Sequence, residues 1–164
     1  MSRAFVGDNE DQATAALPEL PLSPHPNYVT ARGLAQLQAR LSDAQVRLAA
    51  VDGDDDDARL EQDYLGRHIR WLQARLAQAI PVAARDEPEP DRVSFGASVE
   101  VLDANDQRSR YRIVGEDEAD PGQGLVSWVS PLARALVGAR VGDTVVWERP
   151  DGNVEVEVED ISLS

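Results

Sequence analysis

The sequence contains no cysteine, which excludes disulfide bonds, thiolate metal ligands and a cysteine nucleophile. It also contains no lysine, so all 16 basic residues are arginines. Histidine is limited to His25 and His68, which argues against a histidine-rich zinc site and a Ser-His-Asp triad. Aromatic residues make up only 5% of the chain, so a mostly aliphatic core is expected.

Long hydrophobic runs are lacking as well. No apolar stretch approaches the roughly 20 residues of a membrane-spanning helix, and the N-terminus has no signal-peptide pattern. We therefore expect a cytoplasmic protein that makes no membrane contact. The net charge of −14 over 164 residues argues against bulk attraction to DNA or to anionic membranes. This length allows one or two small domains.

The first 29 residues are rich in proline and acidic residues. Proline lacks the backbone N–H that a helix interior needs. The sequence therefore predicts a disordered N-terminal tail over residues 1–29. Its four prolines are Pro18, Pro21, Pro24 and Pro26.

Two series of apolar residues follow, each advancing in alternating steps of three and four residues. This spacing is typical of coiled-coil helices. A polar loop with Gly53 separates the two series, so an antiparallel helical hairpin is predicted over residues 30–80, with Thr30 as the first N-cap. The two series are Leu34, Leu37, Leu41, Ala44, Leu48 and Val51, and then Leu65, Ile69, Leu72, Leu76 and Ala79.

Residues 81–92 contain Pro88 and Pro90 among several acidic residues and are predicted to form a linker. The apolar period then changes to two, which predicts a small antiparallel β domain over residues 93–164. Strands are predicted over residues 144–147 and 154–158, and in the second of these valines alternate with glutamates. One short helix is expected over residues 131–137, with Ser130 as its N-cap and Pro131 at its first position. The fold class is therefore α+β, a helical hairpin followed by a small β domain.

Four segments of the chain resemble one known family. They are residues 28–34, 93–99 and 111–115, and the run Ser-Pro-Leu-Ala-Arg-Ala-Leu-Val-Gly at 130–138, which is followed by Val-Gly-Asp at 141–143. Their order and spacing over residues 28–161 resemble the bacterial GreA/GreB transcript-cleavage and elongation factors. The same resemblance implies an FKBP-like C-terminal domain over residues 93–164.

The resemblance also implies a function. The β domain would dock on the rim of the RNA polymerase secondary channel, and the hairpin would enter that channel. The protein would bind as a monomer, would meet RNA and DNA only within the elongation complex, and would stimulate the polymerase's own RNA cleavage rather than act as an enzyme. The resemblance implies no cofactor bound to the protein alone, but Mg²⁺ shared with the polymerase active site.

Two groups of residues would carry these roles. The catalytic and metal-binding group, called here the tip aspartates, consists of Asp54, Asp55, Asp56 and Asp57. The partner-binding group consists of Trp128, Ser130, Pro131, Leu132 and Arg134.

The tip departs from the family pattern. It lacks the family's Asp-x-x-Glu-Asn-Ala segment, and the hairpin is shorter by about one to two helical turns per arm, or roughly 10 Å of reach. An alternative function is therefore a secondary-channel regulator or inhibitor without cleavage activity. A third hypothesis, prolyl isomerase activity, follows from the FKBP-like topology, but residues 93–164 hold only four aromatic residues.

Each group also has a purely structural interpretation. Acidic residues at the start of a helix stabilise it by about 0.3–1 kcal/mol each, and Trp128 could belong to the core. Without Asp52 and the tip aspartates, residues 30–80 carry seven arginines and three acidic residues, a net charge of +4. Those arginines could bind RNA phosphate or acidic channel walls, or could be ordinary solvated side chains.

Overall fold

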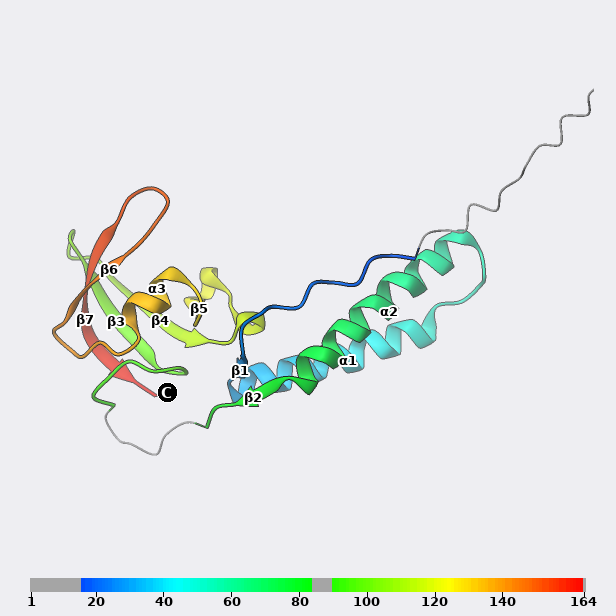
Figure 1. The fold of residues 1–164 in the computed structure, drawn as a ribbon, viewed down its shortest axis with the longest axis horizontal. Helices are drawn as coiled ribbons and strands as arrows, with labels where there is room; N and C mark the ends of the chain where they lie inside the picture. The colour runs from blue at the N-terminus through cyan, green and yellow to red at the C-terminus, as the bar shows by residue number, and fades with distance from the viewer. Residues whose placement is uncertain (1–15, 84–89, 164) are drawn as a thin grey trace, which may run out of the picture.

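The helical hairpin and the β domain lie at opposite ends of an elongated molecule (Figure 1). The structure is a computed structural model that describes residues 16–83 and 90–163. Its hairpin consists of α1 (Ala31–Ala50) and α2 (Asp56–Ala77). A curled β-sheet domain follows, which confirms the predicted α+β fold class.

Local sequence explains where the helices begin. The Thr30 hydroxyl accepts a hydrogen bond from the Gly33 backbone N–H at 3.0 Å, as predicted for the N-cap of α1. Most members of the two predicted apolar series pack together in the hairpin core. Leu37 of α1 and Leu72 of α2 are the most deeply buried members.

Two three-residue strands close the base of the hairpin. β1 (Asn27–Val29) precedes α1, β2 (Ala79–Pro81) follows α2, and the two pair in parallel. The predicted linker over residues 81–92 thus begins inside β2, and its residues 84–89 lie outside the described residues.

Residues 16–26, called here the N-terminal strap, run along α2 from near the hairpin tip to its base (Figure 1). The Glu19 carboxylate pairs with Arg70, and the Trp71 indole N–H donates to the Pro21 carbonyl at 3.2 Å. The prediction of a disordered tail is therefore wrong for residues 16–29, while residues 1–15 lie outside the described part. Proline excludes a helix here, but an extended chain can still offer its carbonyl groups to α2.

The β domain is built on one five-stranded sheet with the strand order β5-β4-β3-β7-β6. Neighbouring strands are antiparallel except β4 and β5, which pair in parallel. The crossover that such a pair needs contains two short 3₁₀ turns, η1 (Glu116–Glu118) and η2 (Pro121–Gln123). The strands are β3 (Ser98–Asp103), β4 (Arg108–Val114), β5 (Leu125–Ser127), β6 (Thr144–Trp147) and β7 (Val154–Ser162).

The core of this domain lies between the sheet and α3 (Pro131–Leu136). Val156 and Val158 of β7 point into it, as their alternation with glutamates predicts. The register between β3 and β7 then shifts, so that the extra residue Glu159 returns Ile161 to the buried face.

Candidate functional site

The hairpin tip is built by a glycine turn and a helix cap. Gly53 has a φ of +94°, in the left-handed region that favours glycine. The Asp55 carboxylate then accepts a hydrogen bond from the Ala58 backbone N–H at 2.8 Å and starts α2. Asp56 and Asp57 occupy the first helical turn, where the helix dipole favours acidic side chains.

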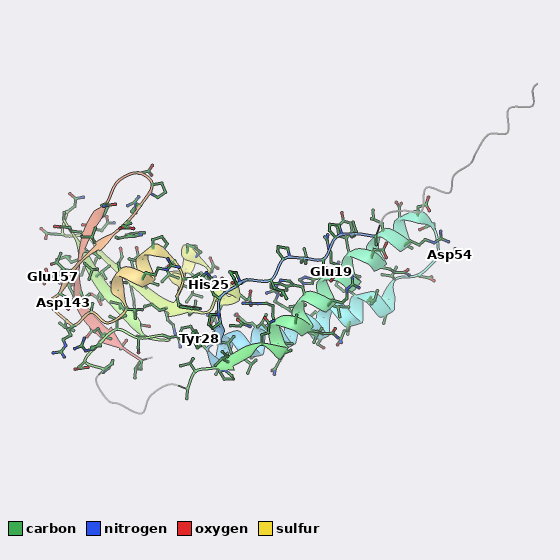
Figure 2. All side chains as sticks on the ribbon, in the orientation of Figure 1. Glu19, His25, Tyr28, Asp54, Asp143 and Glu157 are labelled. Atoms are coloured by element: carbon green, nitrogen blue, oxygen red, sulfur yellow. The ribbon has the colours of Figure 1, made fainter. Side chains whose placement is uncertain are left out.

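All four tip aspartates are exposed, and Asp54 marks the end of the molecule furthest from the β domain (Figure 2). A shallow hollow lies beside them, lined by Asp52, Asp55 and Asp57 together with Arg47. The four consecutive residues therefore differ in their surroundings. Asp55 is engaged as a cap, Asp57 faces the hollow, and Asp54 points to solvent.

Within the described residues, no group of three or more His, Asp or Glu side chains is arranged to hold a metal ion. The tip can still contribute to a shared site, because Mg²⁺ binds through one or two protein carboxylates and keeps water and phosphate ligands. Asp54, Asp56 and Asp57 fit such a role best, since none of them caps the helix.

A second feature of α2 lies beyond the middle of the helix, between the tip and the base of the hairpin. His68 stacks on Trp71 with ring planes 7° apart. Burial lowers the pKa of His68 below its ordinary value, and the positive charges of Arg40 and Arg47 lower it further. His68 is therefore uncharged at neutral pH, and the charge of this region comes from its arginines and acidic residues.

The predicted partner-binding residues around α3 separate into three kinds. Leu132 is only 3% exposed and packs in the β-domain core, so its prediction as a contact residue is wrong. Ser130 caps α3 by accepting from the Ala133 N–H at 3.3 Å. Pro131 and Arg134 are exposed and available for contact.

Trp128 is half-buried beneath the start of the hairpin. The Tyr28 ring packs edge-on against it at 5.1 Å between ring centroids, and the His25 ring lies 5.9 Å away. The indole therefore joins the β domain to β1 and to the chain that leads into it.

Sequence reasoning missed the role of Arg75, one of the seven hairpin arginines. Its side chain is buried at the base of the hairpin and binds Asp117 of η1. The one sequence signal for a buried arginine was its position in the last turn of α2, beside the apolar series. The sequence does not identify the acidic partner, because Asp117 is 42 residues distant.

Comparisons with known proteins give matches to one family. A family model described as "Transcription elongation factor, GreA/GreB, C-term" matches residues 87–163. Transcription elongation factor GreB of Neisseria meningitidis serogroup A is 36% identical over 151 residues, a match that covers 80% of this chain and 91% of that protein. Transcription elongation factor GreA of Yersinia pestis bv. Antiqua is 43% identical over 102 residues, or 62% of this chain, and the match spans 65% of that relative's length.

Among solved structures, the GreA factor homolog 1 of Thermus thermophilus is similar over 84% of this chain and 99% of its own, with 24% identity and a TM-score of 0.41. None of the helices within residues 16–83 and 90–163 has the length and apolar character of a membrane span. On the sequence matches, which extend over both the hairpin and the β domain, this chain belongs to the GreA/GreB family of transcription elongation factors.

Proposed function

We propose that this protein binds RNA polymerase as a monomer in the cytoplasm, inserts its hairpin into the secondary channel and promotes cleavage of backtracked RNA, so that elongation resumes. Family membership supports the general elongation role. The observation that carries the finer proposal is the position of the tip aspartates, exposed at the free end of a projecting hairpin.

The geometry of the tip suggests a different role for each group of residues in this function. When bound, Mg²⁺ at the polymerase active site supplies a Lewis acid that activates the attacking water. Asp54, Asp56 and Asp57 would offer carboxylates toward it, while Asp55 holds the first turn of α2. The β domain would supply the docking surface, with Pro131 and Arg134 as its exposed candidates.

The alternative function is a secondary-channel regulator without cleavage activity. It is favoured by the engagement of Asp55 as a cap and by the lack of a converged acidic group among the described residues. Both functions require binding to polymerase, and only the first requires the tip charges for cleavage.

The experiment is transcript cleavage in stalled, backtracked elongation complexes. The test variant is Asp54→Asn/Asp56→Asn/Asp57→Asn, which removes three charges and keeps the Asp55 cap. The matched control, Asp151→Asn/Glu155→Gln/Glu157→Gln, removes three exposed charges from the β6–β7 hairpin at the other end of the molecule.

We expect cleavage above the intrinsic polymerase rate with the unchanged protein and with the control, and a loss of about 10²-fold or more with the tip variant. Polymerase binding should be unaffected by the tip variant. Polymerase binding without any stimulated cleavage would establish the regulator instead, and absence of binding would exclude both.

A further inference from the structure

The three acidic residues of η1 contact the N-terminal strap and the base of the hairpin, and both Glu116 and Asp117 pair with Arg75. Glu116 accepts a hydrogen bond from the Ser23 hydroxyl at 2.9 Å. Asp117 accepts from Arg75 Nε at 2.7 Å. Glu118, whose side chain is 1% exposed, accepts from the Thr30 hydroxyl at 2.6 Å. We call Glu116, Asp117 and Glu118 the η1 clasp.

Arg75 is the central partner of this clasp. Its side chain is 1% exposed, and Nη2 donates to Asn27 Oδ1 at 2.8 Å. The Asn27 amide in turn donates to the backbone carbonyl of Arg75 at 2.7 Å. One guanidinium group thus connects α2, the start of β1 and η1, and a buried arginine is stable only while such partners remain.

Two glycines let the backbones approach at the same place. A Cβ on Gly115, which immediately precedes the clasp, would lie 2.4 Å from the Tyr28 carbonyl oxygen. A Cβ on Gly33 would lie 2.8 Å from the Glu118 carboxylate. The contact between hairpin and β domain therefore combines charge pairing with a close steric fit.

We propose that Arg75 and the η1 clasp are positioning residues, which fix the direction of the hairpin relative to the β domain and so fix where the tip aspartates lie. Residues 82–92 join the two parts covalently. The described residues of this connection make no set of polar contacts comparable to that of the clasp. The consequence for cleavage rests on the proposed function, whereas the geometric statement does not.

The geometry can be tested in the free protein. Because the chain has no native cysteine, Gln45→Cys on α1 and Glu157→Cys on β7 create a unique pair of sites for spin labels. Both positions are exposed and lie in different parts of the molecule. Double electron–electron resonance then reports the distribution of distances between hairpin and β domain.

Three variants loosen the clasp in different ways: Arg75→Met removes the central cation, Asp117→Asn removes one charge with little change of shape, and Gly115→Ala adds the obstructing Cβ. Two variants are matched controls. Arg59→Met removes an exposed arginine of the same helix, and Gly122→Ala adds a Cβ that meets its nearest atom at an ordinary 3.5 Å.

We expect one narrow distance distribution in the starting protein and in both controls, and a broadened or displaced one in the three clasp variants. Circular dichroism identifies any variant whose hairpin has unfolded, and Asp117→Asn and Gly115→Ala then decide the outcome. A broad distribution in the starting protein, or an unchanged one in the folded clasp variants, overturns the proposal.

The functional arm compares cleavage with polymerase affinity. We expect Asp117→Asn and Gly115→Ala to lower stimulated cleavage by about tenfold or more, since small displacements of reacting groups have large effects, while the polymerase Kd changes by less than about threefold. An unchanged cleavage rate despite a displaced hairpin would overturn the link to positioning. A displaced hairpin in a protein that never stimulates cleavage would refute the proposed function and leave the geometric role of the clasp intact.

Discussion

At the scale of single residues, Asp55 is the tip aspartate for which the structure shows a structural role. Its carboxylate caps α2. We predict that Asp55→Ala lowers the free energy of unfolding by about 1 kcal/mol, measured by urea denaturation. Asp55→Ser should retain most of the stability, because a serine hydroxyl can also cap. Equal losses in Asp55→Ala and Asp54→Ala would contradict this assignment.

Leu132 provides a second prediction at this scale. Because it is buried between α3 and the sheet, Leu132→Ala should lower the free energy of unfolding by about 2–5 kcal/mol. Arg134→Ala, two residues further along the same helix and exposed, should change it by less than about 0.5 kcal/mol. Thermal melts of both variants test the difference, and a mild effect of Leu132→Ala would mean that the side chain is not part of the core.

Residues whose roles depend on near neighbours could be predicted from the sequence. Thr30 and Ser130 were identified as caps because the bonded N–H lies only three residues ahead. Arg75 could not be identified, because Asn27 and Asp117 lie 48 and 42 residues away in the chain. A single sequence does not show which of the seven hairpin arginines pairs with an acidic turn that is distant in the chain.

At the scale of elements, the hairpin depends on contacts between residues that follow a repeating sequence pattern, whereas its base depends on contacts between residues far apart in the chain. The heptad pattern predicted α1 and α2 closely, because coiled-coil packing repeats along the chain. β1 and β2 escaped prediction because each has three residues, and their pairing joins residues 52 positions apart in the chain, as in Tyr28 with Ile80. Alternation located β6 and most of β7, whereas the β7 bulge is a property of its pairing with β3.

The N-terminal strap is an element with a testable dependence on pH. Hydrogen bonds from Arg70 hold the pKa of Glu19 below its ordinary value, and the charges of Arg70 and Arg67 act in the same direction. The strap contact is therefore fully present above the ordinary glutamate pKa. It weakens as the pH falls through the lowered pKa, because the protonated carboxyl no longer pairs with Arg70.

The Trp71 indole N–H, which donates to Pro21, reports this contact in NMR spectra. We predict that its resonance shifts as the pH is lowered below about 4.5, and that Arg70→Gln produces a similar shift already at neutral pH. Glu61→Gln, an exposed change on the same helix, should leave the resonance in place. A resonance unaffected by Arg70→Gln would show that the ion pair does not hold the strap.

At the scale of the whole molecule, the acidic residues behind the net charge of −14 have different roles. The tip aspartates stand exposed at one end, while the three acidic residues of η1 are consumed in contacts with the hairpin base. The net charge argues against bulk attraction to nucleic acid, but it cannot distinguish acidic residues that are exposed from those that hold two parts of the molecule together. That distinction needs the fold.

The clasp also predicts how the molecule unfolds. Because Arg75 is buried among partners from both parts, the hairpin and the β domain should unfold together in one calorimetric transition. Glu116→Gln/Asp117→Asn/Glu118→Gln leaves that cation without a carboxylate partner in the clasp, so the hairpin should melt separately and at least about 5 °C earlier.

The control for this prediction is the triple variant Asp151→Asn/Glu155→Gln/Glu157→Gln, which removes the same number of charges from the β6–β7 hairpin and should keep a single transition. Amide hydrogen exchange assigns the early transition to α1 and α2 if the clasp couples the two parts. If the clasp variant still melts in one step at the same temperature as the control, then burial of Tyr28 and Trp128 at the junction, rather than the charge cluster, supplies the coupling.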